Sequence, residues 1–467
     1  MIDLRRPIVV PSEIAAAVES IVGAAHVRRD PESLARYGTD GTKRSAPADV
    51  VALPGTAREV SAIARWCTDH VVPLVPRGAG TGYSGGAVPI LGGIVLSLER
   101  LNRILEIDER NLVAVVEPCV ITAVLQEAVE RVGLFYPPDP ASLGESSIGG
   151  NVAENAGGPR GFKYGTTRTY VLGLEAVLPT GEIIRTGGRT VKNVAGYDLT
   201  SLLVGSEGTL AIVTQAILRL VPKPPAAEAL KVAFASVDAA AAAVDALLRE
   251  RVVPAAIELI DGECLRAVAA HLGSSSIVPA QAGALLLIEV DGAADAVAAE
   301  TARVVQACRA ANATGIDRAC GEAERRELWR VRRELSPALK QIAPVKVNND
   351  VVVPRGRIPE LFAALARLAR EHDVRIPSFG HAGDGNIHVN IMVEDTEEAR
   401  ARAKAAERRL FEEVIRLGGA LTGEHGIGFV KAPFLGLQLS DDEIALMKRL
   451  KTAFDPKGIL NPGKIFP

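Results

Sequence analysis

The sequence predicts an α+β protein with two principal domains and a carboxyl-terminal segment. Its 467 residues, of which 48% are hydrophobic and 23% charged, are sufficient for two or three globular domains. Glycine-rich loops between short Val/Ile/Leu-rich segments characterise the first half, whereas predicted strands and helices alternate in the second half. The run VPKPPAA, which begins at Val221, separates these patterns, because clustered prolines suit neither a helix interior nor a central strand. We therefore expect a domain boundary directly after Pro222.

The first half is predicted to consist mainly of strands. The segments VVPLVP (71–76) and IVLSL (94–98) have the composition of strands and flank the glycine-rich loop PRGAGTGYSGGAVPILGG (76–93). GLEAVLPTGEIIRTGG (173–188) has the form strand, Pro-Thr-Gly turn, strand, which indicates a hairpin. GSEGTLAIVTQAILRLVP (205–222) extends the same pattern to the proline run.

Strands and helices alternate after the proline run. We expect strands at KVAFASV (231–237), AAIELID (255–261) and ALLLIEVDG (284–292), and helices at VDAAAAAVDALLRE (237–250) and DAVAAETARVVQACRAA (295–311). The last part predicts a helix over 397–419, the glycine-rich loop LTGEHGIG (421–428), a second helix over 440–454 and a tail.

Charge and cysteine content exclude several classes of protein. The net charge of −3 is the small difference between 56 acidic and 53 basic residues, so no broad positive surface favours a nucleic-acid partner. The 5 cysteines are scattered without a C-x-x-C pair, which argues against a disulfide framework, an iron–sulfur cluster or a cysteine zinc site. The amino terminus lacks an apolar segment of signal-peptide type, and no run of about 18 apolar residues occurs. We therefore expect a cytoplasmic protein without a transmembrane segment.

The glycine-rich loop admits two functional interpretations. Gly80 to Gly85 matches G-x-G-x-x-G, the fingerprint of a nicotinamide-binding Rossmann unit, but that unit needs a helix directly after the loop. Pro89, two glycines and a strand-like segment follow instead. The small residues from Gly78 to Gly86 can alternatively bring a row of backbone N–H groups against an anion. The alternative without a binding function is that these glycines only form turns. A second glycine-rich run at 146–165 favours two loops that enclose an extended dinucleotide.

Three of the seven histidines lie close together in the sequence. In GHAGDGNIHVNIMV (380–393), strand alternation places His388 and Asn390 on the face opposite Ile387, and we expect His381 to enter the same strand through the turn AGDGN. Glu424 and His425 follow in TGEHGIG. Two imidazoles and one carboxylate fit a divalent ion such as Zn²⁺, Mn²⁺ or Fe²⁺. A solvated or hydrogen-bonded side chain is the alternative, and we prefer it for four other histidines: His26, His70, His271 and His372.

Six motifs in a common order resemble a known family, the FAD-linked oxidases of the vanillyl-alcohol oxidase and p-cresol methylhydroxylase type. More narrowly, the chain resembles the FAD subunit of glycolate oxidase and the D-lactate and D-2-hydroxyglutarate dehydrogenases. The motifs are PRGAGTGYSGG, PPDPASLGESSIGGNVAENAGGPRGFKYG, GGRTVKNVAGYDLTSLLVGSEGTLAIVT, GHAGDGNIHVN, TGEHGIG and FDPKGILNPGKIF. The resemblance implies a two-subdomain FAD-binding domain (1–222), a substrate or cap domain with an antiparallel sheet covered by helices (223–410), and a helical segment returning to the flavin (411–467).

The resemblance also implies which residues contact FAD. It places the first loop at the pyrophosphate, the second glycine-rich run at the flavin and ribityl chain, the GSEGTLAIV segment near the adenine, and the final asparagine near the isoalloxazine ring. In that order the residues are Arg77, Gly78, Gly80, Thr81, Gly82, Ser84, Gly85 and Gly86; Pro138, Ser147, Gly149, Gly150, Asn151 and Ala153; Glu207, Gly208 and Ile212; and Asn461. Some covalently flavinylated relatives have a histidine at the position of Thr81, so the resemblance implies a dissociable FAD.

The substrate site is likewise implied by the resemblance. The matching positions make His381, His388 and Glu424 the metal ligands and His425 the base, and they make Arg332, Ser336, Lys346 and Asn390 the contacts of a substrate carboxylate. For Arg332 the competing interpretation is a solvated helix face with ion pairs to Glu327 or Glu334, and the adjacent Arg333 would take its place after a one-residue shift.

Together these features predict an FAD-dependent dehydrogenase that oxidises glycolate or a D-2-hydroxy acid to the 2-oxo acid. Since the chain has no cysteine cluster to carry electrons onward, we expect a quinone, an electron-transfer flavoprotein or an iron–sulfur partner subunit as acceptor, with oxygen left open. A homodimer and peripheral attachment to the inner membrane through a partner also stay open. The alternatives are an accessory flavoprotein subunit of a glycolate or lactate oxidase complex, a nicotinamide-linked dehydrogenase, and a metallohydrolase that would leave the first half unexplained.

Overall fold

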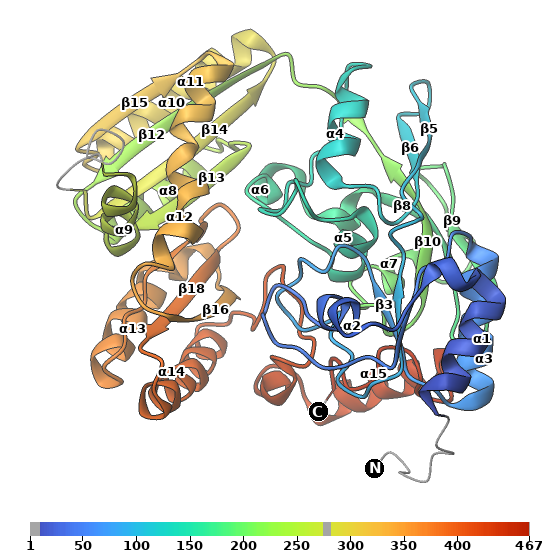
Figure 1. The fold of residues 1–467 in the computed structure, drawn as a ribbon. Coiled ribbons are helices and arrows are strands. Elements are labelled where there is room, and N and C mark those ends of the chain that lie inside the picture. Colours follow the sequence, from blue (N-terminus) through green and yellow to red (C-terminus); the bar gives the residue numbers. More distant parts are fainter. Residues whose placement is uncertain (1–9, 274–281, 467) are drawn as a thin grey trace. The chain divides into compact units, whose positions relative to one another are not determined.

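The computed structural model describes residues 10–273 and 282–466. The first nine residues of the amino-terminal stretch lie outside this range. The chain forms two compact units (Figure 1). Unit 1 comprises Met1–Gly157, Thr166–Lys223 and Glu424–Pro467, and unit 2 comprises Gly158–Gly165 and Pro224–Gly423. The chain thus enters unit 2 at the proline run and leaves it after α14 (Glu397–Arg416), whereas the sequence-based boundary at residue 410 falls inside that helix.

Unit 1 contains three sheets. In the four-stranded sheet, of order β1-β2-β4-β3, β1 and β2 are antiparallel while β4 pairs in parallel with β2 and β3. The five-stranded sheet is antiparallel, with the order β5-β6-β10-β8-β9, and β11 pairs with β7. The strands are β1 (Val27–Arg28), β2 (Val50–Ala52), β3 (Leu74–Arg77), β4 (Ile94–Ser97), β5 (Ile104–Asp108), β6 (Val113–Val116), β7 (Leu134–Phe135), β8 (Val171–Val177), β9 (Ile183–Gly187), β10 (Ile212–Arg219) and β11 (Val221–Pro222).

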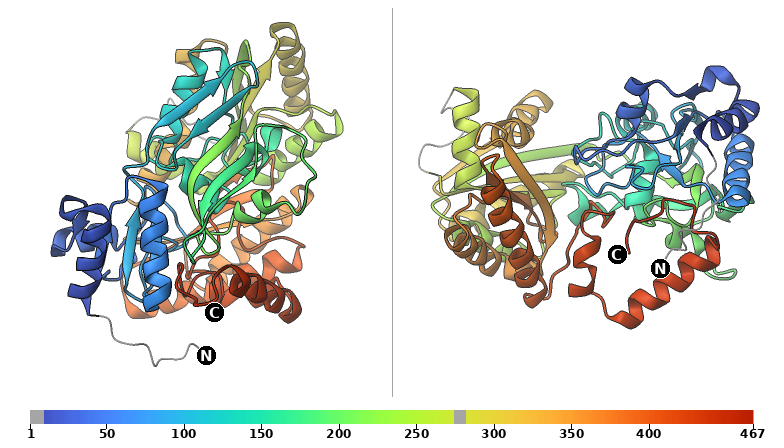
Figure 2. Two further views of the ribbon diagram at one scale, coloured as in Figure 1. Left: turned by 90° about the vertical axis from the view of Figure 1, so that its right-hand side faces the viewer. Right: turned by 60° about the horizontal axis from the view of Figure 1, so that its bottom comes forward.

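The helices of unit 1 include two that pack side by side against the four-stranded sheet, α1 and α3 (Figure 2). Thr56 begins α3 by accepting a hydrogen bond from the N–H of Glu59 (3.2 Å). Residues spaced by three and four, from Val60 to Cys67, then turn one apolar face to the core. The helices of this unit are α1 (Pro11–Val22), α2 (Pro31–Tyr37), α3 (Ala57–His70), α4 (Thr122–Glu130), α5 (Ile148–Glu154), α7 (Leu199–Leu203) and α15 (Asp441–Phe454).

Unit 2 contains one antiparallel sheet of seven strands, with the order β15-β12-β14-β13-β17-β18-β16 (Figure 1). An antiparallel sheet with helical cover is what the sequence predicts for this domain. The strands are β12 (Ala226–Phe234), β13 (Ala256–Asp261), β14 (Ala284–Gly292), β15 (Gly315–Ala319), β16 (Val345–Val352), β17 (Ser378–His381) and β18 (Asn386–Val393).

Helices cover both faces of the unit 2 sheet. Alternate strand residues, such as Ile260, Leu285 and Leu287, form a core with α9 and α12, while α8, α10, α13 and α14 cover the opposite face. The helices of this unit are α6 (Gly161–Tyr164), α8 (Val237–Arg249), α9 (Gly262–Leu272), α10 (Ala294–Ala310), α11 (Glu322–Leu328), α12 (Arg330–Leu339), α13 (Ile358–Glu371) and α14. None of the helices in the described residues combines the length and apolar character needed to span a bilayer.

Two predictions about local structure have clear outcomes. The hairpin is confirmed, because β8 pairs with β9 and the N–H of Leu178 donates to the carbonyl of Glu182 (2.9 Å). The predicted turn between His381 and His388 is confirmed, because a four-residue turn separates them, but the assignment of His381 to the strand of His388 is wrong: His381 ends β17, which pairs with β18. The glycine Gly385 adopts a positive φ of 78°, which lets this tight turn form. The two histidines therefore lie on neighbouring strands.

Candidate active site

The two glycine-rich runs of the first half meet in unit 1. Ser147 caps α5, and its Oγ accepts hydrogen bonds from the N–H of Gly150 and from the N–H of Ala79 in the first loop (3.3 Å each). A Cβ at Gly78 would collide with this Oγ, and one at Gly149 would lie 3.0 Å from the carbonyl oxygen of Pro118. The absence of a side chain at Gly78 therefore permits the close approach of the two runs, and its absence at Gly149 lets α5 lie against Pro118. Residues 86–93, which follow the first loop and are all described, form turns and no helix before β4 begins. A Rossmann unit needs a helix at this point, so the structure argues against one.

Other residues predicted to contact FAD lie around these runs. Arg77 ends β3 and donates to the carbonyl of Thr39 (2.6 Å). The backbone of Thr81 and Gly82 lies against Gly41. Ser84 is buried and donates to the carboxylate of Glu154 (3.2 Å). Gly85 lies against Phe429, and Asn151 donates to Thr122 (2.7 Å). Pro138 accepts from Gln126 (2.9 Å), the carbonyl of Ala153 accepts from the N–H of Glu207 (2.8 Å), and Gly208 lies against Pro76. Ile212 differs from the rest because its side chain is 1% exposed in the hydrophobic core.

Glu207 and Asn461 connect the first loop to the last part of the chain. Asn461 Nδ2 donates to the carbonyls of Gly86 (3.0 Å) and Glu207 (2.8 Å). The Glu207 carboxylate accepts the N–H groups of Ile427 (2.8 Å) and Gly428 (2.6 Å), within TGEHGIG. Burial raises the pKa of Glu207, although these two N–H donors and two nearby lysines act in the opposite direction. The Glu207 side chain thus holds the loop that carries His425.

His425 lies beside the first glycine-rich loop. Its imidazole stacks on the ring of Tyr83, with 5.2 Å between the ring centroids and an angle of 30° between the planes. Its Nε2 lies 4.0 Å from Oε1 of Glu424. The backbone can place these neighbours in one turn because Gly426 adopts a φ of 81° that a side chain would oppose.

In unit 2, the sheet face covered by α9 and α12 carries a row of polar side chains. Strand register places Glu258 opposite His381, Asp350 opposite His388, and Asn348 opposite Asn390. Opposite residues of an antiparallel pair project to the same face, so these side chains lie on one side of four adjacent strands. The sequence-predicted alternation of His388 and Asn390 against Ile387 is confirmed by this arrangement.

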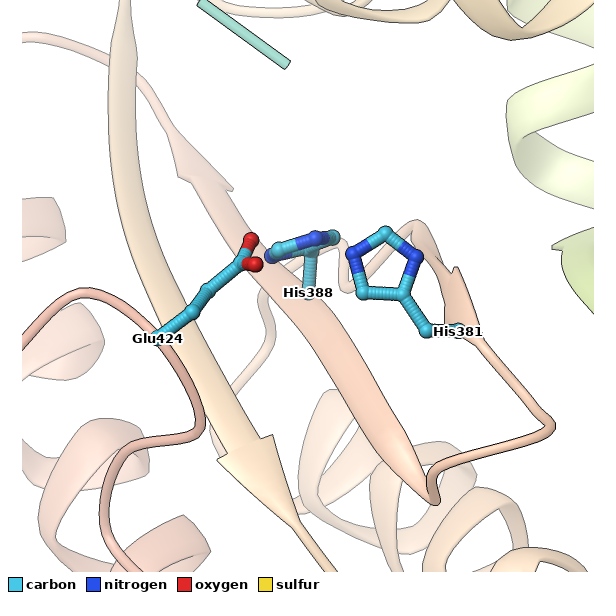
Figure 3. Close-up of side chains that lie close together, drawn as sticks. All are labelled: His381, His388 and Glu424. Atoms are coloured by element: carbon cyan, nitrogen blue, oxygen red, sulfur yellow. The ribbon is translucent and has the colours of Figure 1, made fainter. Parts of the chain in front are cut away.

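His381, His388 and Glu424 converge on one point (Figure 3). One ligand atom from each lies within 4.8 Å of the other two, and the histidines are 3% and 5% exposed. Glu424 directly follows Thr422 and Gly423, which both donate to the carboxylate of Asp350 (3.0 and 2.7 Å). Since Asp350 lies opposite His388, these bonds hold the start of the Glu424 loop beside the histidines.

The sequence analysis missed Glu258, which is fully buried on β13. One carboxylate oxygen accepts from Nδ1 of His381, and the other accepts from Nε of Arg332 (2.5 Å). Burial would raise the pKa of Glu258, but the charges and hydrogen bonds of His381 and Arg332 outweigh it and lower the pKa to about 2. The available signal was a carboxylate flanked on both sides by apolar residues, between Ile257 and Leu259, since a buried charge needs a partner.

The predicted substrate contacts also lie on this side of the sheet. Arg332 and Ser336 lie on α12, and Nζ of Lys346 donates to Oγ of Ser336 (3.4 Å). Burial lowers the pKa of Lys346. Asn390 accepts from Asn348 (2.8 Å). The structure thus brings these four residues to the same face of the sheet as the histidines.

The competing interpretation of Arg332 as a solvated helix residue is wrong. Arg332 binds Glu258, whereas Glu327 pairs with Arg330 (3.2 Å) and Glu334 with His271 (3.3 Å). The guanidinium also lies over the ring of Phe379, 4.6 Å from its centroid.

Comparisons with known proteins agree with this architecture. A family model described as FAD binding domain matches residues 48–187, and one described as FAD linked oxidases, C-terminal domain, matches residues 223–465. The chain is 46% identical over 435 residues to glycolate oxidase subunit GlcD of Bacillus subtilis (strain 168), which covers 92% of each chain. It is 34% identical to D-2-hydroxyglutarate dehydrogenase of Stutzerimonas stutzeri (strain A1501), over 96% of this chain and 98% of that protein.

A crystal structure of p-cresol methylhydroxylase with substrate bound has the same fold, with a TM-score of 0.81 over 97% of this chain and 96% of that chain, at 18% identity. The sequence and fold matches together cover both domains. The chain therefore belongs to the FAD-linked oxidases, and it is an FAD-dependent oxidoreductase related to glycolate oxidase subunit GlcD and to the D-2-hydroxy-acid dehydrogenases.

Proposed function

We propose that this protein oxidises glycolate or a D-2-hydroxy acid, such as D-lactate or D-2-hydroxyglutarate, to the corresponding 2-oxo acid. The observation that carries the proposal is the convergence of His381, His388 and Glu424 on the side of the sheet where Lys346 projects from β16 and Arg332 from α12. A divalent ion and two cations on one side of a sheet suit a small molecule with a carboxylate and a neighbouring hydroxyl. The names of the relatives support the same substrate class.

The three clustered side chains fit a resident divalent ion. Two buried imidazoles and one carboxylate form the donor set that Zn²⁺, Mn²⁺ and Fe²⁺ accept, and three protein ligands leave open positions for substrate. Nδ1 of His381 is engaged by Glu258, so Nε2 is the atom that would bind the ion. We assign these residues as the metal ligands.

FAD would be held by unit 1. The first loop from Arg77 to Gly86 lies against the run from Ser147 to Asn151, an approach that a side chain at Gly78 would prevent. Two adjoining glycine-rich segments can present backbone N–H groups to the phosphates of a dinucleotide, which supports the assignment of FAD to this part of unit 1. Thr81 has no nucleophilic imidazole, so we propose that FAD is bound without a covalent bond.

The remaining residues bind and deprotonate the substrate. Arg332 and Lys346 supply positive charge to the substrate carboxylate, while Ser336 and Asn390 supply hydrogen bonds. His425 accepts the proton of the substrate hydroxyl on a ring nitrogen. FAD, held by unit 1, would supply the acceptor for the hydride equivalent from the substrate Cα, and a divalent ion on His381, His388 and Glu424 would supply polarisation of the hydroxyl oxygen.

The electrons then need an acceptor outside this chain. We propose a quinone, an electron-transfer flavoprotein or an iron–sulfur subunit. The Bacillus subtilis relative is called a subunit, which supports a partner protein. Such a partner would also account for any peripheral membrane attachment.

Anaerobic mixing with substrates tests the proposal. The FAD-loaded protein is mixed with a panel of D- and L-2-hydroxy acids, and the absorption of oxidised flavin is followed in a stopped-flow instrument. Glycolate or a D-isomer should bleach the flavin, and His425→Ala should slow this step about 10² to 10⁴-fold because the proton acceptor is lost. His372→Ala, at the end of α13, is the matched control. Near-normal reduction of His425→Ala, or no reduction by any member of the panel, would contradict the proposal.

A further inference from the structure

Glu258 is a charged residue at a position where apolar residues would be expected. It lies in the middle of β13 and is 0% exposed, among neighbours that are almost all apolar. Removing a carboxylate from water is costly unless charged partners and hydrogen bonds compensate. Each oxygen of Glu258 has its own partner, because one accepts from His381 and the other from Arg332.

The first contact determines how His381 presents its ring. Strand register places Glu258 directly opposite His381, so its carboxylate lies within hydrogen-bond distance of Nδ1 of His381. With the proton held on Nδ1, the lone pair lies on Nε2, on the side of the ring that faces His388 (Figure 3). A carboxylate behind a ligating histidine fixes its tautomer and raises its basicity as a ligand.

The second contact determines how Arg332 presents its guanidinium. Glu258 engages Nε, and the ring of Phe379 lies 4.6 Å from Cζ, so the plane of the group is fixed from two sides. The terminal amino groups are the part of a guanidinium that binds a planar carboxylate in bidentate fashion. Fixing Nε therefore orients the fork.

We propose that Glu258 is a positioning residue shared by the two halves of the substrate site, orienting a metal ligand with one oxygen and the carboxylate-binding arginine with the other. This inference rests on the proposed function. It implies that metal affinity and substrate affinity are coupled through one buried carboxylate, so that a change at Glu258 affects both.

Glu258→Gln is the sharpest variant because it keeps the shape and replaces one oxygen by an amino group. The amide can accept from only one partner. If the amino group faces His381, Nδ1 must accept and the proton moves to Nε2, which removes the ligand lone pair; if it faces Arg332, two donors oppose each other. Glu289→Gln is the matched control, since Glu289 lies on the same face of β14 and accepts from Nε1 of Trp329 (3.0 Å).

Two quantities are measured on the full-length FAD-loaded protein. Affinity for Zn²⁺ is obtained from competition with a chelator, with bound metal counted by mass spectrometry, and KM and kcat are obtained with the best substrate of the panel. We expect Glu258→Gln to lower metal affinity about 10 to 100-fold and to raise KM about tenfold or more at saturating metal. Glu289→Gln should match the wild type in both.

The outcomes separate this inference from the proposed function. A wild-type protein that binds no metal and reduces no flavin contradicts the proposed function. In an active enzyme, a Glu258→Gln protein that matches Glu289→Gln in either quantity contradicts the shared role. If Glu258→Gln does not fold, the same measurements on Glu258→Asp decide: its shorter carboxylate cannot reach both partners, so wild-type values for both quantities would overturn the inference.

Discussion

At the scale of single residues, the site depends on buried charges that each have a defined partner. Glu258 accepts hydrogen bonds from His381 and Arg332. In the same way, Asp350 accepts from Thr422 and Gly423, and Glu207 accepts from the N–H groups of Ile427 and Gly428. Because a buried carboxylate is costly when it loses a partner, these contacts fix side-chain positions more strictly than surface ion pairs do.

Arg332→Lys should raise KM for the 2-hydroxy acid about 10 to 100-fold, while FAD content stays unchanged. A lysine keeps the charge but loses the planar fork in which Nε binds Glu258 while the terminal amino groups remain for a bidentate contact with the substrate carboxylate. Steady-state kinetics check this. Arg333→Lys is the control, because Arg333 is exposed on the same helix. If instead Arg333→Lys raised KM and Arg332→Lys did not, the substrate contact would be the neighbouring arginine.

Lys464 gives a prediction about pH. Burial lowers its pKa from 10.5 to about 8, while Asp40 and Glu207 act in the opposite direction. The folded protein thus releases this proton at lower pH than the unfolded chain, so the Lys464 contribution to the free energy of unfolding rises between pH 8 and 10.5, by at most about 3 kcal/mol. Urea unfolding at several pH values should show this rise in the wild type and not in Lys464→Met. Parallel pH profiles of the two proteins would contradict it.

At the scale of elements, short loops held at both ends position the reactive groups. TGEHGIG is fixed at its start by Asp350 and near its end by Glu207, so Glu424 and His425 lie on a stretch with little freedom. The first glycine-rich loop is also held near both ends, because the N–H of Ala79 donates to Ser147, the cap of α5, and the carbonyl of Gly86 accepts from Nδ2 of Asn461.

Gly149→Ala should weaken FAD binding and lower the free energy of unfolding by about 1 to 3 kcal/mol. Its Cβ would lie 2.5 Å from Cβ of Pro118 and 3.0 Å from its carbonyl oxygen, so α5, whose cap Ser147 binds the first loop, would have to shift. Gly144→Ala is the control in the same segment, because nothing lies within 4 Å of its Cβ position. Fluorescence titration with FAD and thermal unfolding measure the two effects. Equal FAD affinity in the two variants would show that the tight approach at Gly149 is unimportant.

Glu207→Gln should slow flavin reduction, because an amide can accept only one of the two N–H groups and the loop bearing His425 loses a restraint. We expect the protein to lose about 1 to 3 kcal/mol of stability as well. Stopped-flow reduction is compared with that of Glu106→Gln, which alters an exposed ion pair of unit 1. A normal reduction rate in Glu207→Gln would mean that His425 is positioned by other contacts.

At the scale of the whole molecule, FAD and the proposed divalent ion would be held by different residues. The residues proposed for FAD belong to unit 1, whereas two of the three proposed metal ligands, His381 and His388, belong to unit 2 and the third, Glu424, is the first residue of the last segment of unit 1. Removal of the divalent ion by dialysis against a chelator should therefore abolish substrate-dependent flavin reduction and leave the FAD content unchanged. Absorption spectra and metal analysis before and after dialysis test this, with chelator presaturated with Zn²⁺ as the control. Parallel loss of FAD and metal would contradict the separation.

Local patterns were sufficient for much of the element order. The hairpin of β8 and β9, the strand character of β12, β13 and β14, and the helices α8, α10, α14 and α15 follow from residue periodicity and turn chemistry. The turn AGDGN was recognisable, but its composition could not show that His381 ends a separate strand, because the pairing of β17 with β18 depends on contacts across the turn. Periodicity also did not reveal that the chain leaves unit 2 after α14, since a unit boundary depends on long-range contacts.

The sequence by itself determined the family through six motifs, and it predicted the glycine-rich segments as FAD contacts and three side chains as metal ligands. Only the tertiary structure showed that His381 and His388 project from the same face of the sheet and that Glu258 binds His381 on the side of its ring opposite the proposed ion. Glu258 is 123 residues from His381 and 74 from Arg332, yet strand register and the packing of α12 place its two oxygens between them. The physical reason is that the role of a buried carboxylate depends on which groups bind it, and groups distant in sequence become its neighbours only when the sheet forms.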